Sequence, residues 1–287
     1  MAKEKHHYIP VCYLTNFSED GKGIWVYNKE KQPPYQTSIY DIFKIKNLYK
    51  LEENLIPEQY KDVLNSKTFE YDFFARSLEN QFSNFLNVLN ATFTDDYLDK
   101  IASYDSIADD YFFEHITFQM VIQFFRMPEM RENVKKLLSE VTDKTGYKSP
   151  TGNPVIDHMM CLFGDGKLIK KYQELLLQDI IVLYVSRSSY FYTSDTPVIR
   201  ENLPLDDDGF SLDYDKCIIT YPLTKNILVQ IFDKKYYGVQ FGYINRHIVF
   251  VDDIFVSTVN RKRIHLSKKE IVSPINDFNK KKRIWRN

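Results

Sequence analysis

The sequence has little glycine, few cysteines and no long hydrophobic run. Only 9 of its 287 residues are glycine, which disfavours phosphate-binding loops, because backbone approach to phosphate usually needs several glycines. The three cysteines, Cys12, Cys161 and Cys217, lie far apart without a CxxC pair. That spacing excludes a zinc knuckle and indicates small buried apolar residues. No apolar run reaches membrane-spanning length, and the charged start argues against a signal peptide. We therefore expect a cytoplasmic protein with no membrane partner.

The sequence also lacks an excess of charge of either sign. Its formal net charge is -1, whereas a protein that coats nucleic acid is usually strongly basic. A local patch that binds nucleic acid or a nucleotide stays open, as does a protein partner. The length and the 44% apolar content suit one globular unit. We predict a single domain over residues 1–287, with a candidate subdomain joint at 145–154, where glycine and proline gather.

The first half of the chain is predicted to be a short strand–turn segment followed by helices. An aromatic, β-branched run at 23–27 favours a strand after a turn. Apolar residues at helical spacing predict a helix over 67–92. A second helix is expected over 111–125, and because it is apolar almost all round it should be buried. Pro128 ends it, since proline removes a backbone donor and clashes with the preceding turn.

The second half is predicted to turn from helix to sheet. Residues 155–185 favour helix, and short strands flanked by turn residues follow at 188–193, 217–221 and 227–232. The acidic stretch 203–215 is expected to be an exposed hairpin loop. Residues 234–251 are assigned to a covering helix and 254–258 to a closing strand. The fold class is thus α+β, an N-terminal strand–turn segment on a helical body followed by a small mixed or antiparallel sheet with a covering helix.

The first candidate for chemistry is the pair His6-His7. A neutral imidazole binds metal or acts as a general base near neutral pH. The string 6–10 also resembles the opening strand of an HNH-type nuclease, in which such residues hold the metal and activate water. An HNH finger needs a later asparagine, for which Asn16, Asn28 and Asn47 are the nearby candidates. It also needs a histidine or asparagine on the following helix, and the next histidine here is His115. The alternative is that His6 and His7 hydrogen-bond across a structural strand.

Two further candidates are helical. Asp72 and Glu79 are seven residues apart, so an α-helix places both carboxylates on one face, which is either a site or the solvent-exposed face. On the apolar helix, Gln119, Gln123 and Arg126 follow His115 along one stripe. Buried polar groups need partners, and the carboxylate of Asp72 or Glu79 suits the Arg126 guanidinium. The stripe forms either a polar cleft or an internal ion-pair network.

The last candidate is the turn Thr193-Ser194-Asp195-Thr196-Pro197. Ser194 lacks the GxSxG context of a nucleophile elbow. Asp195 either accepts backbone hydrogen bonds as an Asx-turn or serves as a metal ligand at a strand end.

A series of motifs runs along the chain: 6–10 with Tyr13-Leu14 and Asn16-Phe17, Trp25-Val26-Tyr27, Tyr49, Asp72 to Glu79, Gln119 to Arg126 with Pro128 and Arg131, 194–198, 221–224 and Asn245-Arg246. In this order the motifs resemble the domain of unknown function 4238 family of bacterial proteins. The resemblance covers most of residues 5–258. It implies an architecture and candidate positions, but no reaction. Thr196 departs from the family pattern, which usually has asparagine there, and Asp72 stands where glutamate is commoner.

Two hypotheses follow. In the first, the protein is a metal-dependent nuclease or phosphodiesterase-like hydrolase, a bacterial toxin or antiviral-defence effector, with a divalent Mg²⁺ or Mn²⁺ ion. His7, Glu79 and Asp195 would be the metal ligands, and the catalytic set would be His6, His7, Arg126, Gln119 and Gln123. In the second, the chain is a non-catalytic binding module whose polar residues form a buried structural network. Convergence on an open cleft would favour the enzyme, and closed salt bridges would favour the module.

Overall fold

A computed structural model describes residues 5–51, 54, 56–62, 64–65, 68–102, 104–107, 109–146, 151–202 and 215–278. The fold is α+β, as predicted. The elements of the first half are β1 (Lys5–His7), α1 (Val11–Leu14), η1 (Thr15–Phe17), β2 (Gly23–Asn28), β3 (Tyr35–Ser38), β4 (Lys44–Lys46), η3 (Glu58–Tyr60), η4 (Thr68–Glu79), α2 (Asn80–Thr92), α3 (Asp95–Leu98), β5 (Asp105–Ser106), α4 (Asp110–Arg126) and α5 (Pro128–Thr145). Those of the second half are α6 (Pro154–Phe163), α7 (Lys167–Gln178), β6 (Ile180–Ser186), β7 (Thr193–Ser194), β8 (Ile199–Glu201), β9 (Ile218–Pro222), β10 (Ile227–Phe232), α8 (Lys234–Phe241), η5 (Gly242–Ile244), β11 (His247–Val251), α9 (Asp253–Leu266) and β12 (Glu270–Ser273).

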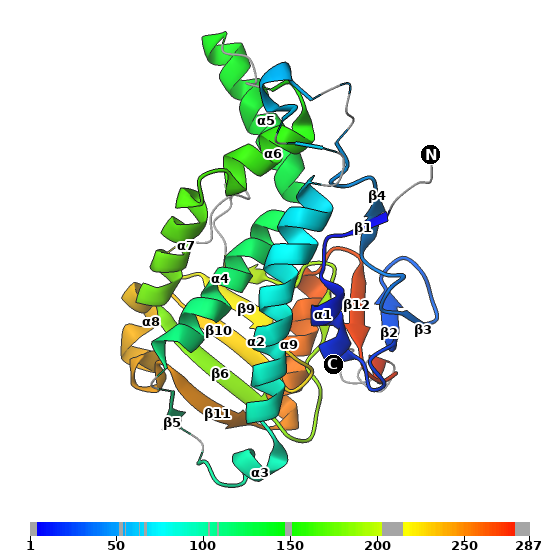
Figure 1. Ribbon diagram of the computed structural model, residues 1–287. Helices are drawn as coiled ribbons and strands as arrows, with labels where there is room; N and C mark the ends of the chain where they lie inside the picture. The colour runs from blue at the N-terminus through cyan, green and yellow to red at the C-terminus, as the bar shows by residue number, and fades with distance from the viewer. Residues whose placement is uncertain are drawn as a thin grey trace.

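A six-stranded mixed sheet lies at the centre, in the order β5-β11-β6-β10-β9-β8. Strands β11 and β6 run parallel, and the other neighbours run antiparallel. Helices α2 and α4 lie across one face of this sheet, and α8 and α9 lie on the other side (Figure 1). Side chains alternate between the two faces along a strand. Ile181, Leu183 and Val185 accordingly join the core beneath α4, whereas Ile180 and Val182 join the one beneath α8 and α9.

Burial on both faces explains a wrong helix prediction. Every residue of β6 is buried, so its sequence is apolar without alternation, a pattern that a buried helix shares. The helix predicted for 155–185 is therefore two helices, α6 and α7, followed by this strand. The strands predicted at 217–221 and 227–232 are present as β9 and β10.

The C-terminal region differs more from the prediction. The covering helix placed at 234–251 ends at Phe241, and its last part is strand β11. Residues 254–258 belong to helix α9, and the strand that closes the fold is β12. The strand expected at 188–193 reduces to the short β7. The hairpin loop expected at 203–215 lies outside the described residues except for Asp215, as do residues 147–150 of the candidate joint.

A second sheet joins the two ends of the chain. Its order is β3-β2-β12-β7. The last strand, β12, therefore lies between β7 and the N-terminal strand β2. All its pairs are antiparallel. A separate two-stranded sheet pairs β1 with β4, with His6 opposite Ile45. The four-stranded sheet holds the N-terminal strand β2 beside the C-terminal strand β12 (Figure 1). Within the described ranges, no helix is both long and apolar enough to cross a bilayer.

Candidate functional site

Arg126 is the centre of the polar cluster that the sequence singled out. It ends the buried helix α4 and is 1% exposed. Its Nη2 donates to Oε1 of Glu79 at 2.6 Å and to the carbonyl oxygen of His7 at 2.6 Å. Burial disfavours the charge, but Glu79 and Tyr49 more than compensate, so the pKa of Arg126 is raised. The guanidinium thus ties the N-terminal strand to the end of η4.

Tyr49 connects the same elements from another side. Its backbone N–H donates to Nδ1 of His6 at 2.9 Å, and its hydroxyl donates to the carbonyl oxygen of Arg126 at 2.8 Å. The guanidinium carbons of Arg126 and Arg131 lie 5.8 and 5.6 Å from the Tyr49 ring centroid. Phe74, from η4, lies 4.4 Å from the Arg126 carbon. Two arginines from adjacent helices therefore share one buried aromatic platform.

The paired histidines have different environments, as expected for neighbours on an extended strand. His6 is 3% exposed and stacks on Tyr49 with an interplanar angle of 2°. His7 is half-buried, and its Nε2 has no hydrogen-bond partner among the described residues. Burial, reinforced by Lys44, lowers the pKa of His7, although Glu79 opposes the shift. His6 is therefore part of the core, whereas His7 is a neutral imidazole next to the Arg126–Glu79 pair.

The polar stripe of α4 divides into two parts. Gln123 donates to the carbonyl oxygen of Tyr8 at 3.0 Å, one residue beyond the carbonyl that Arg126 binds. These two side chains hold the N-terminal backbone. Gln119 is 3% exposed, and its Nε2 has no partner among the described residues. His115 lies apart from this cluster, between the rings of Phe85 and Tyr111.

Asp72 and Glu79 do not share an environment. Asp72 is exposed, whereas the Glu79 side chain is 22% exposed and pairs with Arg126. The segment that carries both, η4, is π-helical. The i→i+5 hydrogen bonds of a π-helix give each residue a smaller rotation than in an α-helix, so residues seven apart leave the common face. The prediction of one shared carboxylate face was wrong for this reason.

Asp195 accepts backbone hydrogen bonds, but from a segment distant in the sequence and not as the Asx-turn that was one alternative. Its carboxylate accepts hydrogen bonds from the N–H groups of Lys268, Lys269 and Glu270 at 3.1, 2.6 and 2.9 Å. Burial raises the pKa of Asp195, and these three donors oppose the shift. The carboxylate joins the turn after β7 to the start of β12. No contact links it to His7 or Glu79 among the described residues.

The expected metal ligands are consequently not assembled in one place. In the part of the chain that the structure describes, no three His, Cys, Asp or Glu side chains are grouped as metal ligands. His7 and Glu79 lie close enough to interact electrostatically. The Sγ atom of Cys12 contacts the backbone oxygen of Glu79 at 3.8 Å. The neighbouring pair offers at most two side-chain ligands to a divalent ion, so water or substrate would have to complete the coordination.

Two buried cationic or basic residues were not found from the sequence. Arg263, on α9, is 1% exposed and donates to the carbonyl oxygens of Thr196, Pro197 and Thr220. Its sequence neighbours are also basic, so no pattern distinguishes it. His158, on α6, is 1% exposed and contacts the carbonyl oxygen of Phe125 at 3.0 Å. Burial and the nearby Arg131 lower the pKa of His158 to about 4.

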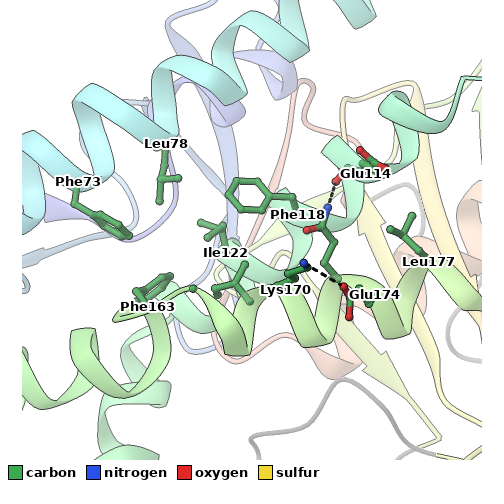
Figure 2. Close-up of a pocket in the computed structure, with 12 residues that line it drawn as sticks. Phe73, Leu78, Glu114, Phe118, Ile122, Phe163, Lys170, Glu174 and Leu177 are labelled. Carbon is green, nitrogen blue, oxygen red and sulfur yellow. Dashed lines mark hydrogen bonds and ion pairs between the residues drawn. The ribbon is translucent and has the colours of Figure 1, made fainter.

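A groove lies apart from this cluster, between η4, α4 and α7 (Figure 2). Its volume is about 510 Å³. Polar contacts lie at one end, where Gln173 donates to the carbonyl oxygen of Glu114 and Lys170 lies 3.8 Å from Glu174. Figure 2 shows apolar side chains from η4, from α4 and from the end of α6 directed toward one another. The apolar residues that line the groove are Phe73, Leu78, Phe118, Ile122, Phe163, Ile169 and Leu177.

The two regions offer different chemistry. The Arg126 cluster is largely closed, because its guanidinium is already bound by Glu79 and by the His7 carbonyl. Nε2 of His7 has no hydrogen-bond partner among the described residues and is itself shielded from solvent. The groove is open and apolar, and its volume falls within the range of about 300–1,000 Å³ that is typical of small-molecule sites.

The cluster and the groove both fall within a region that matches a known family model. Residues 5–276 match the family described as "Protein of unknown function (DUF4238)". The chain therefore belongs to this family, which confirms the resemblance inferred from the motifs. Comparison with curated proteins and with solved structures gives no match.

Proposed function

We propose that this member of the DUF4238 family is a binding module that takes a small, mainly apolar molecule in the groove of Figure 2. The supporting observation is that the groove is open and apolar, whereas the Arg126 cluster is closed by its own contacts. The volume of about 510 Å³ lies within the range that is typical of small-molecule sites.

In this proposal the Arg126 cluster, formed by His6, His7, Tyr49, Glu79 and Arg126, has a structural role. Its contacts join β1, η4, the end of α4 and Tyr49, and thereby fix the ends of α4 and η4, both of which also line the groove. A buried network of hydrogen bonds and ion pairs favours one arrangement of the elements that it joins. The cluster would thus shape the groove without touching the ligand.

The test is binding of Nile red, an uncharged apolar dye whose fluorescence rises in apolar surroundings. We expect saturable binding to the parent protein. Leu177→Trp fills the groove from its partly exposed wall and should weaken binding about tenfold. Leu137→Trp, at a 47% exposed position on α5, is the matched control and should leave binding unchanged. Absence of binding, or equal binding by both variants, would refute the proposal.

A second candidate is the metal-dependent nuclease or phosphodiesterase-like hydrolase, acting as a toxin or antiviral-defence effector. One observation favours it. His7 is a neutral imidazole with an unengaged Nε2, and it lies beside both a carboxylate and a guanidinium. These are the groups that general-base catalysis and phosphate stabilisation use. Opening of the cluster would be needed to admit a nucleic acid or nucleotide.

The assay for this candidate is hydrolysis of single-stranded DNA and RNA oligonucleotides with Mg²⁺ or Mn²⁺. His7→Ala removes the imidazole but keeps the carbonyl that Arg126 binds, so the fold should persist. The hydrolase candidate requires that His7→Ala lose activity, while His265→Ala, at an exposed position, keeps it. No hydrolysis by the parent with either metal, or equal rates in both variants, would eliminate this candidate.

A further inference from the structure

A second pocket, of about 320 Å³, lies on the other side of the α4 N-terminus, between α4 and α2. We call it the α2–α4 aromatic pocket. It is distinct from the groove because no residue lines both. Its walls are mainly aromatic, with one valine, two amides and one carboxylate. The residues that line it are Gln81, Asn84, Phe85, Val88, Asp109, Tyr111, Phe112 and His115.

The rings of this pocket form a continuous row. His115 stacks on Phe85, with centroids 5.4 Å apart and an interplanar angle of 25°. The His115 ring also contacts the ring of Tyr111, with centroids 4.6 Å apart. Phe112 extends the row, 5.7 Å from Phe85. Tyr111 is 66% exposed and Val88 is 65% exposed, so the pocket is accessible from solvent.

The charge of the pocket is negative. Asp109 is the one acidic or basic residue besides His115 among the described residues that line it. The carboxylate is held in place, because its Oδ1 accepts from the backbone N–H of Tyr111 at 3.0 Å and so caps α4. The adjacent Asp110 is already paired with Arg246. Burial lowers the pKa of His115, so its ring is neutral at pH 7 and adds no positive charge.

Aromatic faces beside a carboxylate are complementary to an organic cation. The ring quadrupole presents negative charge at its faces, and a weakly hydrated ammonium loses little hydration when it approaches them. We propose that the α2–α4 aromatic pocket binds a small molecule carrying a quaternary or alkylated ammonium group. Tyr111, Phe85 and His115 contribute the aromatic surface, and Asp109 supplies the counter-charge.

Choline and its uncharged carbon isostere, 3,3-dimethyl-1-butanol, are the probes, because they differ in charge and hardly in shape. Binding is measured on the full chain by NMR titration. We expect choline to bind at least about threefold more tightly than the isostere. Equal binding of the two probes, or tighter binding of a purine nucleoside than of choline, would overturn the proposal, the latter in favour of a planar ligand.

Two variants assign the effect to this pocket. Asp109→Asn removes the charge, and asparagine is as good a helix N-cap as aspartate, so the fold is preserved. Tyr111→Leu removes an exposed ring. Each substitution should weaken choline binding about threefold or more. Asp109→Asn should leave the affinity for the uncharged isostere unchanged. Tyr236→Leu, at a tyrosine 54% exposed on α8, is the control. Unchanged choline binding in both pocket variants would contradict the assignment.

Discussion

The Nη2 atom of Arg126 lies 2.6 Å from Oε1 of Glu79 and 2.6 Å from the carbonyl oxygen of His7. One buried cation therefore holds two segments that are far from it in the sequence. Removing one partner of a buried ion pair leaves the other charge uncompensated, which costs far more than the loss of a surface pair.

Glu79→Ala should accordingly lower the free energy of unfolding by about 2–4 kcal/mol, toward the lower end because the Glu79 side chain is 22% exposed. Urea unfolding measures the change. Asp72→Ala, on the same π-helical segment but exposed, is the matched control and should stay within about 0.5 kcal/mol of the parent. Equal losses of unfolding free energy in the two variants would show that the Arg126–Glu79 pair stabilises the fold no more than an exposed carboxylate does.

His158 should make stability depend on pH. Its pKa of about 4 in the folded protein lies below the ordinary value of 6.5. Between these values the unfolded chain binds a proton that the folded protein does not, so stability falls as the pH falls from about 6.5 to about 4. The contribution lost is about 3 kcal/mol.

His158→Gln removes this titration, so the loss of stability between pH 6.5 and 4 should be smaller than in the parent. The measurement is the urea midpoint at several pH values. Comparing parent and variant cancels the carboxylates, which titrate in both. His265→Gln, at an exposed position, should retain the parental profile. Parallel pH profiles of the parent and His158→Gln would contradict the prediction.

Asp195 should matter for stability through its backbone contacts. Asp195→Ala leaves three N–H groups of residues 268–270 without their acceptor and should cost about 3 kcal/mol. Asp195→Asn keeps one acceptor oxygen and should cost less. Glu140→Ala, exposed on α5, is the control. Thermal unfolding with and without Mn²⁺ adds a second readout, since a metal-ligand role predicts Mn²⁺ stabilisation of the parent that Asp195→Asn loses.

Replacing the guanidinium of Arg263 by an ammonium group should destabilise the fold. Its guanidinium donates to three carbonyl oxygens from two segments, and a lysine ammonium cannot reach them in the same geometry. Arg263→Lys should therefore lower the free energy of unfolding by about 2–3 kcal/mol. Arg261→Lys, exposed on the same helix, should change it by less than about 0.5 kcal/mol. Guanidinium chloride unfolding of the pair provides the comparison.

Local patterns were sufficient where one environment prevails along a segment. Helix α4 was predicted at nearly its observed bounds, because apolar residues all round a segment of that length indicate a buried helix. Strand β6 was missed because burial on both faces removes the alternation that marks a strand. The shared face of Asp72 and Glu79 failed because the prediction assumed α-helical rotation and the segment is π-helical.

The candidate site was predicted in part. The sequence singled out Arg126 as a buried cation in need of a carboxylate, and the structure supplies Glu79. Tyr49 lay in a segment that matched the family, but nothing local indicated its contacts. Arg263 gave no signal, because Arg261 and Lys262 beside it are equally basic. The pockets could not be predicted either, since each is lined by residues of several elements.

The sequence by itself determined the fold class, the buried character of α4 and the need of its polar residues for partners. These depend on the period of apolar residues and on the cost of burying polar groups. Only the tertiary structure decided which partners meet, because Arg126 is 119 residues from His7 and 77 from Tyr49. Pairing at such separations depends on how sheets and helices stack, which no local pattern specifies. For the same reason, only the structure separated the closed Arg126 cluster from the open groove.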